Sequence, residues 1–424
     1  MDYSRIDAMI DQDRIVDFFK SIVRIPSNRF EEENVARHIG TYMNGMGMTV
    51  SYQKVRQKQL ETVNVIGRFG PNKGGKRIVL CAHMDTGSGQ YQGLVFQPEK
   101  WTKKPLDPVV EDGYFYGLGT HNDKQGVCCM VMAADAVIKS GVPIDGEIIV
   151  AAVAAETVGG VGAGHLVRDG LKADVGVILE GTGLDIVPIS VGKIRGRIFV
   201  KGEHQHHSAH VNPVEQLRHL LEAFSPGYAK NRAQSFLTTK LSEPELPGVP
   251  SAAIRWIHSD NLDLDRVGAY FDVMVLHDQT PDSVKKDLER LIDAIRKEHP
   301  EFDAEVEVSG WEPPASENFI WGAPGTPTDS DIVQRVASHH EAVRKERPVI
   351  GAGKRFGAAS DAASLRRAGI RTIEYAPGSI GPGGELKSWP AIDERVRLKD
   401  VIDCTRILAR AIADLTNEPR EAKR

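Results

Sequence analysis

The sequence has few cysteines, no excess of basic residues and no long apolar run. Its four cysteines, Cys81, Cys128, Cys129 and Cys404, form no CxxC pair, so we expect reduced thiols. We expect the adjacent Cys128 and Cys129 to be small buried hydrophobic residues. The formal net charge of -5 excludes the basic surface of a nucleic-acid-binding protein. No apolar run approaches the ~20 residues of a membrane span, and the acidic start MDYSRIDAMIDQDR does not resemble a signal peptide. These absences predict a cytoplasmic protein.

The residues that are present describe a globular protein with more than one core. The chain has 424 residues, 41% hydrophobic and 26% charged, and is too long for a single ordinary core. Buried parallel strands are predicted from three nearly continuous apolar runs, Arg77–Cys81, Glu147–Val153 and Asp174–Leu179. Further elements are predicted as helices at Asp11–Val23, Asn122–Lys139, Asp329–Arg347 and Leu398–Leu415, and a strand at Arg371–Tyr375. We therefore expect an α/β fold, with a mostly parallel sheet and helices on both faces.

A different pattern occupies the middle of the chain, from about Ile189 to Gly310. Its predicted elements are alternating strands at Ile194–Lys201, Tyr270–Leu276 and Ala304–Val308, and helices at Pro213–Phe224 and Pro281–Lys297. Alternation of apolar and polar residues predicts an antiparallel sheet with one face in water and one face covered by helices. We expect residues 189–310 to form an inserted α+β domain, and residues 1–188 and 311–424 to form the catalytic domain.

Metal-binding and acid–base side chains follow the three predicted buried strands. His83 and Asp85 end the first in LCAHMDT, Glu156 follows the second in AAETVGGVG, and Glu180 follows the third in ILEGTG. Ligands bind at the carboxyl ends of parallel strands, where Asp85 can orient the His83 imidazole and a partly desolvated Glu156 suits a general base. Taken singly, each residue also fits a simpler role, as a histidine at a strand end or a glutamate that opens a helix.

The stretch YGLGTHNDKQGV, from Tyr116 to Val127, opens the helix predicted between the first two strands. Its glycines permit a tight turn and close helix packing. Asn122 and Asp123 stand at the helix start, where either side chain would also serve as an ordinary N-cap. Capping alone would not require a histidine and acidic residues at the neighbouring strand ends.

The inserted domain carries a histidine-rich segment, KGEHQHHSAHVNP, from Lys201 to Pro213. Such a cluster could bind a metal by itself. A loop at a strand end could equally reach across a cleft and place one histidine against a substrate as an electrophile. Late in the chain, glycine-rich turns occur in GAASDAA and YAPGSIGPGG, and an acidic pair occurs in DERV.

In their order and spacing, these motifs resemble the superfamily of aminoacylases, glutamate carboxypeptidases and succinyl-diaminopimelate desuccinylases. The resemblance covers nearly the whole chain: HxD, the frame GxGxxDxKG, a glutamate before glycines, an acidic strand end, a lid histidine, SDA and GPG. It implies a catalytic domain with two zinc-like ions and an inserted lid domain that dimerises. The roles that it implies are metal ligation by His83 and Glu180, orientation by Asp85, general base catalysis by Glu156, and a lid histidine at His206 with His207 beside it.

The sequence departs from this superfamily at the ligands of the second ion. In the register of the family, Asn122 replaces the bridging aspartate and Thr157 replaces the second glutamate. The segment KSWPAIDERV contains no histidine, although the superfamily places one shortly before the acidic pair that Asp393 and Glu394 match. The joint loss predicts that the second metal site is absent while the first remains.

We therefore expect one divalent ion per chain, held by His83, Asn122 and Glu180. This set carries one formal negative charge and should bind its ion weakly, with manganese expected first and zinc, cobalt or iron as alternatives. A neutral ligand suits a substrate that stores negative charge itself, such as an electron-poor aromatic amine that water attacks at the ring carbon. The resemblance then implies an aminohydrolase that converts an amine such as 5-nitroanthranilate to the hydroxyl product and releases ammonia.

Three other interpretations stay open. The first is a dipeptidase or N-acyl-amino-acid deacylase with two ions, in which Asp123 serves as the bridge. The second is a non-catalytic binding module, and the third is zinc storage by the histidine-rich segment. The expected partner is a small-molecule substrate rather than nucleic acid or a membrane, and the resemblance implies a homo-oligomer, at least a dimer through the inserted domain. Candidate substrate-binding residues are His207, Arg355 and Thr157, with Arg195 and Lys193 as further cations that fit solvated surface charges equally well.

Overall fold

The structure is a computed structural model that describes residues 2–86, 98–205, 208–225, 232–237, 252–258, 265–275, 279–308, 323–351, 360–378 and 391–420. The chain divides into two compact units, one within Met1–Ile189, Pro324–Phe356 and Ser360–Arg424, the other within Ser190–Ala323. The predicted insertion ended at Gly310, whereas the second unit extends to Ala323, beyond residues 309–322, which lie outside the described residues.

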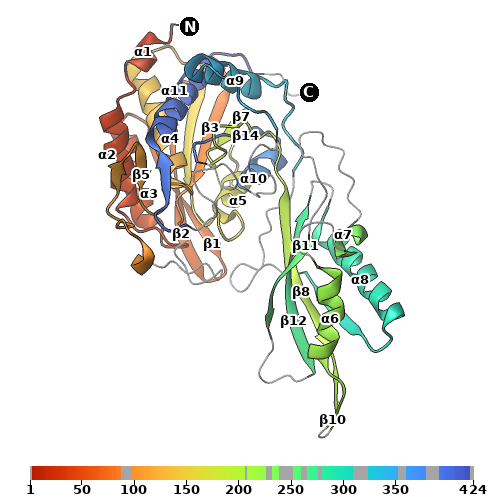
Figure 1. The fold of residues 1–424 in the computed structure, drawn as a ribbon. Coiled ribbons are helices and arrows are strands. Elements are labelled where there is room, and N and C mark those ends of the chain that lie inside the picture. Colours follow the sequence, from red (N-terminus) through yellow and green to blue (C-terminus); the bar gives the residue numbers. More distant parts are fainter. Residues whose placement is uncertain are drawn as a thin grey trace. The chain divides into compact units, whose positions relative to one another are not determined.

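The first unit is built on a six-stranded sheet with the order β1-β2-β6-β3-β7-β14 (Figure 1). Its strands are β1 (Thr49–Gln57), β2 (Leu60–Phe69), β3 (Arg77–His83), β6 (Glu147–Val153), β7 (Val175–Ile178) and β14 (Arg371–Glu374). The strands β6, β3, β7 and β14 are parallel, which confirms the predicted α/β class with a mostly parallel sheet. The antiparallel pair β1 and β2 at one edge was not predicted.

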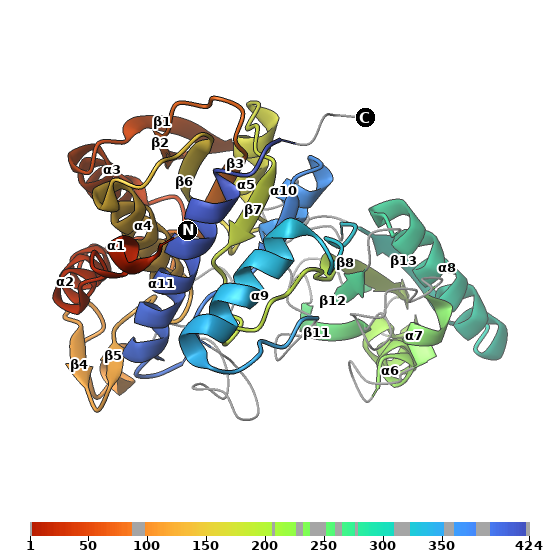
Figure 2. The ribbon, with the colours of Figure 1, turned by 90° about the horizontal axis from the view of Figure 1, so that it is seen from above.

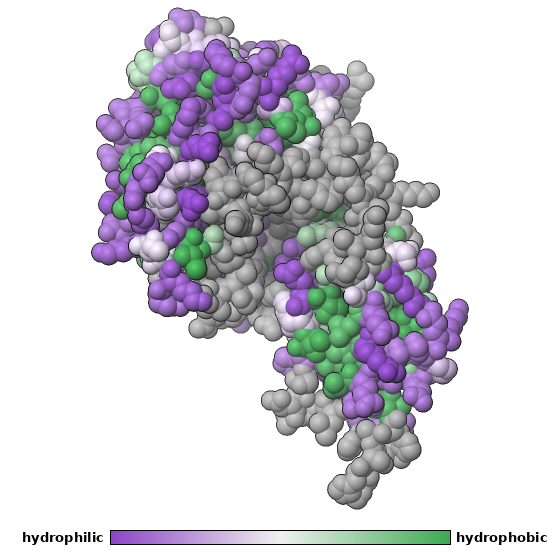
Figure 3. All heavy atoms as spheres, viewed as in Figure 1, coloured by the Kyte–Doolittle hydropathy of each residue, from purple (hydrophilic) through white to green (hydrophobic). Residues whose placement is uncertain are grey.

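Helices cover both faces of this sheet because its strands are apolar on both sides. One core joins alternate residues such as Ile78 and Leu80 to helices of the first face, and another joins Val79 and Cys81 to helices of the second. The first face carries α1 (Ser4–Asp7), α2 (Gln12–Val23), α3 (Glu33–Gly45), α4 (Lys124–Ser140), α9 (Asp331–Arg344) and α11 (Leu398–Leu415). The second carries α5 (Val161–Arg168) and α10 (Ala362–Arg367). Figure 2 shows α11 between α4 and α9, and Figure 3 shows that the outer surface over these helices is mainly hydrophilic.

Local sequence signals set the ends of the helices that flank the site. Asp11 caps α2, because its side chain accepts hydrogen bonds from the backbone N–H groups of Asp13 and Arg14. The helix α4 is buried along most of its length, and it contains the free, buried thiols of Cys128 and Cys129, as predicted.

In the part of the chain that the structure describes, no helix has the length and apolar character that a membrane crossing requires.

A small antiparallel sheet brings the end of the chain to the start of α4. It consists of β4 (Val109–Glu111), β5 (Tyr114–Tyr116) and β15 (Arg395–Arg397), in the order β15-β5-β4, and a short 3-10 helix (Pro98–Lys100) precedes it. Arg395 pairs with Tyr116, so the segment just before β15 lies beside the turn that follows Tyr116. This pairing places Glu394 next to the stretch that contains Asn122.

The second unit has the antiparallel sheet expected of the inserted domain. Its elements are β8 (Gly192–Lys201), β11 (Ala252–His258), β12 (Arg266–Val275) and β13 (Asp303–Glu307), the hairpin β9 (Glu203–Gln205) and β10 (Ser208–Val211), and the helices α6 (Pro213–Ala223), α7 (Arg232–Phe236) and α8 (Pro281–Glu298). Alternate residues of β8 pack in a core with these helices.

Of the cations considered for substrate binding, Arg195 pairs with the buried Asp272 (Nε–Oδ1 3.0 Å) and Lys193 lies 3.9 Å from the same carboxylate.

We predict that Gly126→Ala destabilises the first unit by about 1–3 kcal/mol, because overpacking in a filled core forces backbone shifts. A methyl group at Gly126 would lie 2.3 Å from the carbonyl oxygen of Leu179 and 2.8 Å from Oδ1 of Asp123. The matched control is Gly164→Ala in α5, where nothing lies within 4 Å of the added carbon and helix propensity should raise stability by about 0.5–1 kcal/mol. Denaturant unfolding of both variants checks this, and equal midpoints would contradict it.

Candidate metal centre

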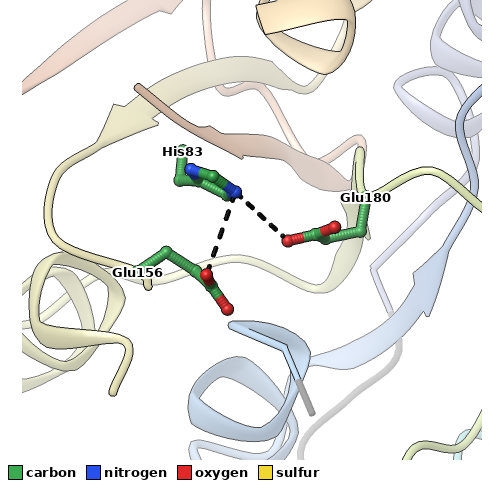
Figure 4. Close-up of side chains that lie close together, drawn as sticks. All are labelled: His83, Glu156 and Glu180. Atoms are coloured by element: carbon green, nitrogen blue, oxygen red, sulfur yellow. Dashed lines mark ion pairs between the residues drawn. The ribbon is translucent and has the colours of Figure 1, made fainter. Parts of the chain in front are cut away.

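Three adjacent parallel strands bring the candidate ligands to one edge of the sheet. His83 is the last residue of β3, Glu156 follows the end of β6, and Glu180 follows the end of β7. Since β3 lies between β6 and β7 and is parallel to both, the carboxyl ends of all three meet. Figure 4 shows the three side chains pointing toward one another.

The distances suit a small metal site. Nε2 of His83 lies 3.4 Å from Oε1 of Glu180 and 3.8 Å from Oε2 of Glu156. Within the described residues, these three form the group of histidine, cysteine or acidic side chains that could hold a metal ion, with ligand atoms within 4.8 Å of one another. All three are buried. An imidazole nitrogen and carboxylate oxygens are donors that Zn²⁺, Mn²⁺ and Co²⁺ accept, so the residues fit a divalent ion.

Asp85 holds the histidine and the glutamate loop together. Its Oδ1 lies 3.3 Å from Nδ1 of His83 and accepts a hydrogen bond of 2.9 Å from the backbone N–H of Glu156. Its Oδ2 accepts from the backbone N–H and the hydroxyl of Thr157, at 3.0 and 2.5 Å. Asp85 therefore lies where it can orient the His83 ring, and it also fixes the turn that carries Glu156.

Two acidic neighbours of His83, Glu156 and Asp85, have opposite electrostatic environments. Burial raises the pKa of Glu156 well above its usual value, with the carboxylates of Glu180 and Asp361 adding to the effect against the opposing charge of His83. Burial also opposes ionisation of Asp85, but His83 and the donors from residues 156 and 157 lower its pKa below the usual value. A carboxyl group with a raised pKa can take and return a proton near neutral pH, which is the property that a general base needs.

Asn122 and Asp123, at the start of α4, differ in the hydrogen bonds of their side chains. Oδ2 of Asp123 accepts from the backbone N–H of His83 (3.3 Å), and Oδ1 accepts from the side chain of Gln125 (2.9 Å). Oδ1 of Asn122 is buried and has no hydrogen-bond partner among the described residues. The peptide bond between the two residues is cis. A bridging role for Asp123 would break two hydrogen bonds, whereas the Asn122 oxygen is available as a neutral ligand.

Glu394 is a site residue that the sequence analysis matched but gave no role. Its Oε1 accepts from the backbone N–H groups of His121 (2.8 Å) and Asn122 (3.0 Å), and its Oε2 accepts from Gly119 (3.0 Å). Burial raises the pKa of Glu394 to about 7, although these donors and the buried Lys124 act in the opposite direction. Glu394 therefore holds the turn that presents Asn122.

Three more buried residues near the centre had no predicted role. Asp361, in the motif SDA, has its pKa raised to about 7 by burial and by the neighbouring Glu180, with His83 opposing. Glu32 accepts from the backbone N–H of Ala155 (3.0 Å). Arg29 donates from Nε to the hydroxyl of Thr157 (2.6 Å). The SDA motif was a usable signal for Asp361, whereas no local pattern marks Arg29 or Glu32.

Several predicted site residues lie outside the described residues. These are the lid histidines His206 and His207, the cation Arg355, and the segment 379–390 that includes most of the histidine-free stretch before Asp393. Their roles stay predictions. Asp393 itself accepts from the backbone N–H and the hydroxyl of Thr102 and from the N–H of Lys103, so it anchors a loop.

A buried histidine and two glutamates at the ends of parallel strands form a candidate site for a divalent metal ion. The profile of Peptidase family M20/M25/M40 matches residues 79–414, and the chain belongs to this family of metal-dependent hydrolases. It is similar to a succinyl-diaminopimelate desuccinylase of Methylorubrum extorquens, at 25% identity over 93% of this chain and 96% of that protein. The resemblance to this superfamily is thereby confirmed.

Solved structures share the fold. The di-peptidase Dug1p of Saccharomyces cerevisiae gives a TM-score of 0.75 at 14% identity, covering 99% of this chain and 100% of that chain. The YXEP protein of Bacillus subtilis, described as a dinuclear metal-binding peptidase of family M20, gives 0.63 at 12% identity, covering 95% and 98%.

We predict that metal affinity falls as the pH is lowered. Burial opposes a charge on His83, but Asp85, Glu180 and Glu156 raise its pKa well above the usual value. The ion must displace this proton, so binding is strongest above the raised pKa and should weaken about tenfold per pH unit below it for each proton released. Isothermal titration with Mn²⁺ in buffers of different ionisation enthalpy measures the protons released. Binding independent of pH from about pH 6 to about pH 9 would contradict the prediction.

We predict that Glu394→Gln weakens Mn²⁺ binding by about tenfold or more, which is typical of lost outer partners of a ligand. The amide nitrogen would face a backbone N–H donor and disorder the turn that carries Asn122. The matched control is Asp393→Asn, which contacts residues 102 and 103 instead of that turn. Equal Mn²⁺ affinity in the two variants would contradict the assignment.

Proposed function

We propose that the chain hydrolyses the amide C–N bond of an N-acyl amino acid or a dipeptide, using one divalent ion. The observation that carries the proposal is the buried group of His83, Glu156 and Glu180. Membership of the M20 family and similarity to a protein named a desuccinylase and to the fold of a di-peptidase support an amide substrate. The sequence favoured an aromatic amine as substrate first, and these relatives support the amide alternative better.

The residues have separate roles in this proposal. His83, Glu180 and the amide oxygen of Asn122 hold the ion, and Asp85 fixes the His83 ring. When bound there, a divalent ion lowers the pKa of a coordinated water and polarises a substrate oxygen; manganese is our first choice of metal, with zinc, cobalt or iron as alternatives. Glu156 takes the proton of the attacking water and returns it to the leaving nitrogen, for which its raised pKa is suited. His206, in the second unit, is proposed to stabilise charge that develops on the substrate.

A second candidate function is hydrolysis of an electron-poor aromatic amine. It is favoured by the replacement of two anionic ligands of the family by Asn122 and Thr157, which leaves a less anionic site. A ring that delocalises negative charge needs less help from the protein, and a carboxylate next to the amine could ligate the ion. In this version the substrate is an amine such as 5-nitroanthranilate, as for 5-nitroanthranilate aminohydrolase, and the product is the hydroxyl compound with ammonia.

The decisive experiment assays the Mn²⁺-loaded protein against N-succinyl and N-acetyl amino acids, dipeptides and anilines with a carboxylate next to the amine. We expect new primary amine from the amides, and Glu156→Gln should lower kcat by about 10²–10⁴-fold while metal binding persists. Ammonia from the anilines with no amide cleavage would replace the first proposal by the second. Metal binding with no turnover of any substrate would favour a binding module. Loss of bound zinc on substitution of His206 and His207 alone would favour zinc storage by the histidine-rich segment.

A further inference from the structure

A buried arginine stands beside the candidate metal centre. The chain on both sides of Arg29 is tied to the ends of the strands that carry the site. The hydroxyl of Ser27 donates to the carbonyl oxygen of Met84 (2.7 Å), and the Ser27 carbonyl accepts from the N–H of Thr86 (2.9 Å). On the C-terminal side of Arg29, the carboxylate of Glu32 accepts a hydrogen bond from the backbone N–H of Ala155 (3.0 Å). Arg29 is 8% exposed, so its position is set by the same strand ends as the ligands.

A hydrogen-bonded chain links this arginine to the metal-binding histidine. Nε of Arg29 donates to the hydroxyl of Thr157 (2.6 Å), and this hydroxyl donates to Oδ2 of Asp85 (2.5 Å). Oδ1 of Asp85 lies 3.3 Å from Nδ1 of His83. The hydroxyl oxygen of Thr157 therefore already accepts from a cation, and its proton is used by Asp85. A residue with these two bonds is a poor ligand for a metal ion.

We propose that Arg29 is a fixed positive charge that limits this centre to one divalent ion. The inference rests on the single-ion centre of the proposed function. Five buried carboxyl groups surround the site, on Glu32, Asp85, Glu156, Glu180 and Asp361. When they are ionised, such a concentration of acids attracts more than one cation. Arg29 offsets part of this negative charge with a permanent positive charge. Its hydrogen bond to Thr157 fixes that charge on one side of the site.

This proposal differs from a simple shortage of ligands. If the lost ligands were the whole reason for a single ion, restoring an aspartate at position 122 and a glutamate at position 157, two of the three ligands that the resemblance implies, would be enough to bring back a second ion. If Arg29 excludes it, a glutamate at position 157 would pair with the guanidinium instead. Arginine stays protonated at every accessible pH and is suited to bonding a carboxylate through two N–H groups.

The test counts metal ions per chain by mass spectrometry after loading with excess Mn²⁺ and gel filtration. The wild type and the double variant Asn122→Asp/Thr157→Glu should each hold one ion. The triple variant Asn122→Asp/Thr157→Glu/Arg29→Gln should hold two, and its electron paramagnetic resonance spectrum should show a spin-coupled pair. Two ions in the double variant, or one in the folded triple variant, would overturn the role of Arg29. Two ions in the wild type would instead overturn the single-ion centre of the proposed function.

Control variants separate charge from side-chain size and stability. Arg29→Lys in the double background keeps the charge and should leave one ion, and two ions there would contradict an effect of charge. Arg24→Gln in the same background removes an exposed arginine that lies 4.0 Å from Asp107, and it should also leave one ion. If the triple variant does not fold, Arg29→Gln alone decides: removal of a nearby like charge should tighten binding of the first Mn²⁺ by about tenfold. Unchanged affinity would overturn the proposal.

Discussion

The arrangement of the site depends on one buried carboxylate, that of Asp85. It joins the end of β3 to the turn after β6, because it faces the His83 imidazole and accepts three hydrogen bonds from residues 156 and 157. An isolated carboxylate in this position would be neutral, since burial disfavours charge. The donors and the imidazole keep Asp85 ionised, and in return the ring of His83 and the backbone of Glu156 have a fixed orientation. The candidate ligand His83 and the candidate base Glu156 are thus positioned by a group that need not contact substrate.

Two buried carboxyl groups of the same site, those of Asp85 and Glu156, differ in the direction of their pKa shifts. Asp85 is saturated with donors, so its pKa is lowered, whereas the side chain of Glu156 has acidic neighbours and a raised pKa. Both are buried, and the difference comes mainly from their neighbours: the charge of His83 and the donors of residues 156 and 157 lower the pKa of Asp85, whereas Glu180 and Asp361 add to the rise at Glu156. Glu394 shows an intermediate case: three backbone donors and the buried Lys124 only partly offset its burial. Separated pKa values within one site are the arrangement expected where one acid supports structure and another transfers protons.

The sequence predicts the position of a site residue well where that residue directly follows a buried strand. The apolar runs predicted β3, β6 and β7, and a parallel sheet then requires His83 and the two glutamates to meet. Arg29 could not be found in this way, because its contact with Thr157 spans 128 residues and follows no periodic pattern. Glu394 reaches the site only because the short strand β15 pairs with β5. The antiparallel strands β1 and β2 were missed because the first is largely polar and exposed, which hides the usual signal of a buried strand.

In the proposed single-ion centre, the residues at positions 29, 122 and 157 are related by charge. The resemblance implies an aspartate at position 122 and a glutamate at position 157, where this chain has the neutral Asn122 and Thr157, and Arg29 places a positive charge beside Thr157. The loop at Asn122 is held by the buried carboxylate of Glu394, through a bond of 3.0 Å to the Asn122 backbone N–H. An aspartate at position 122 would place a second negative charge beside that buried acid, which costs free energy unless a cation offsets it. With the neutral Asn122 there, the proposed single ion and Arg29 have less negative charge to offset. The two neutral residues and the arginine therefore act in the same direction, because each makes the site less negative.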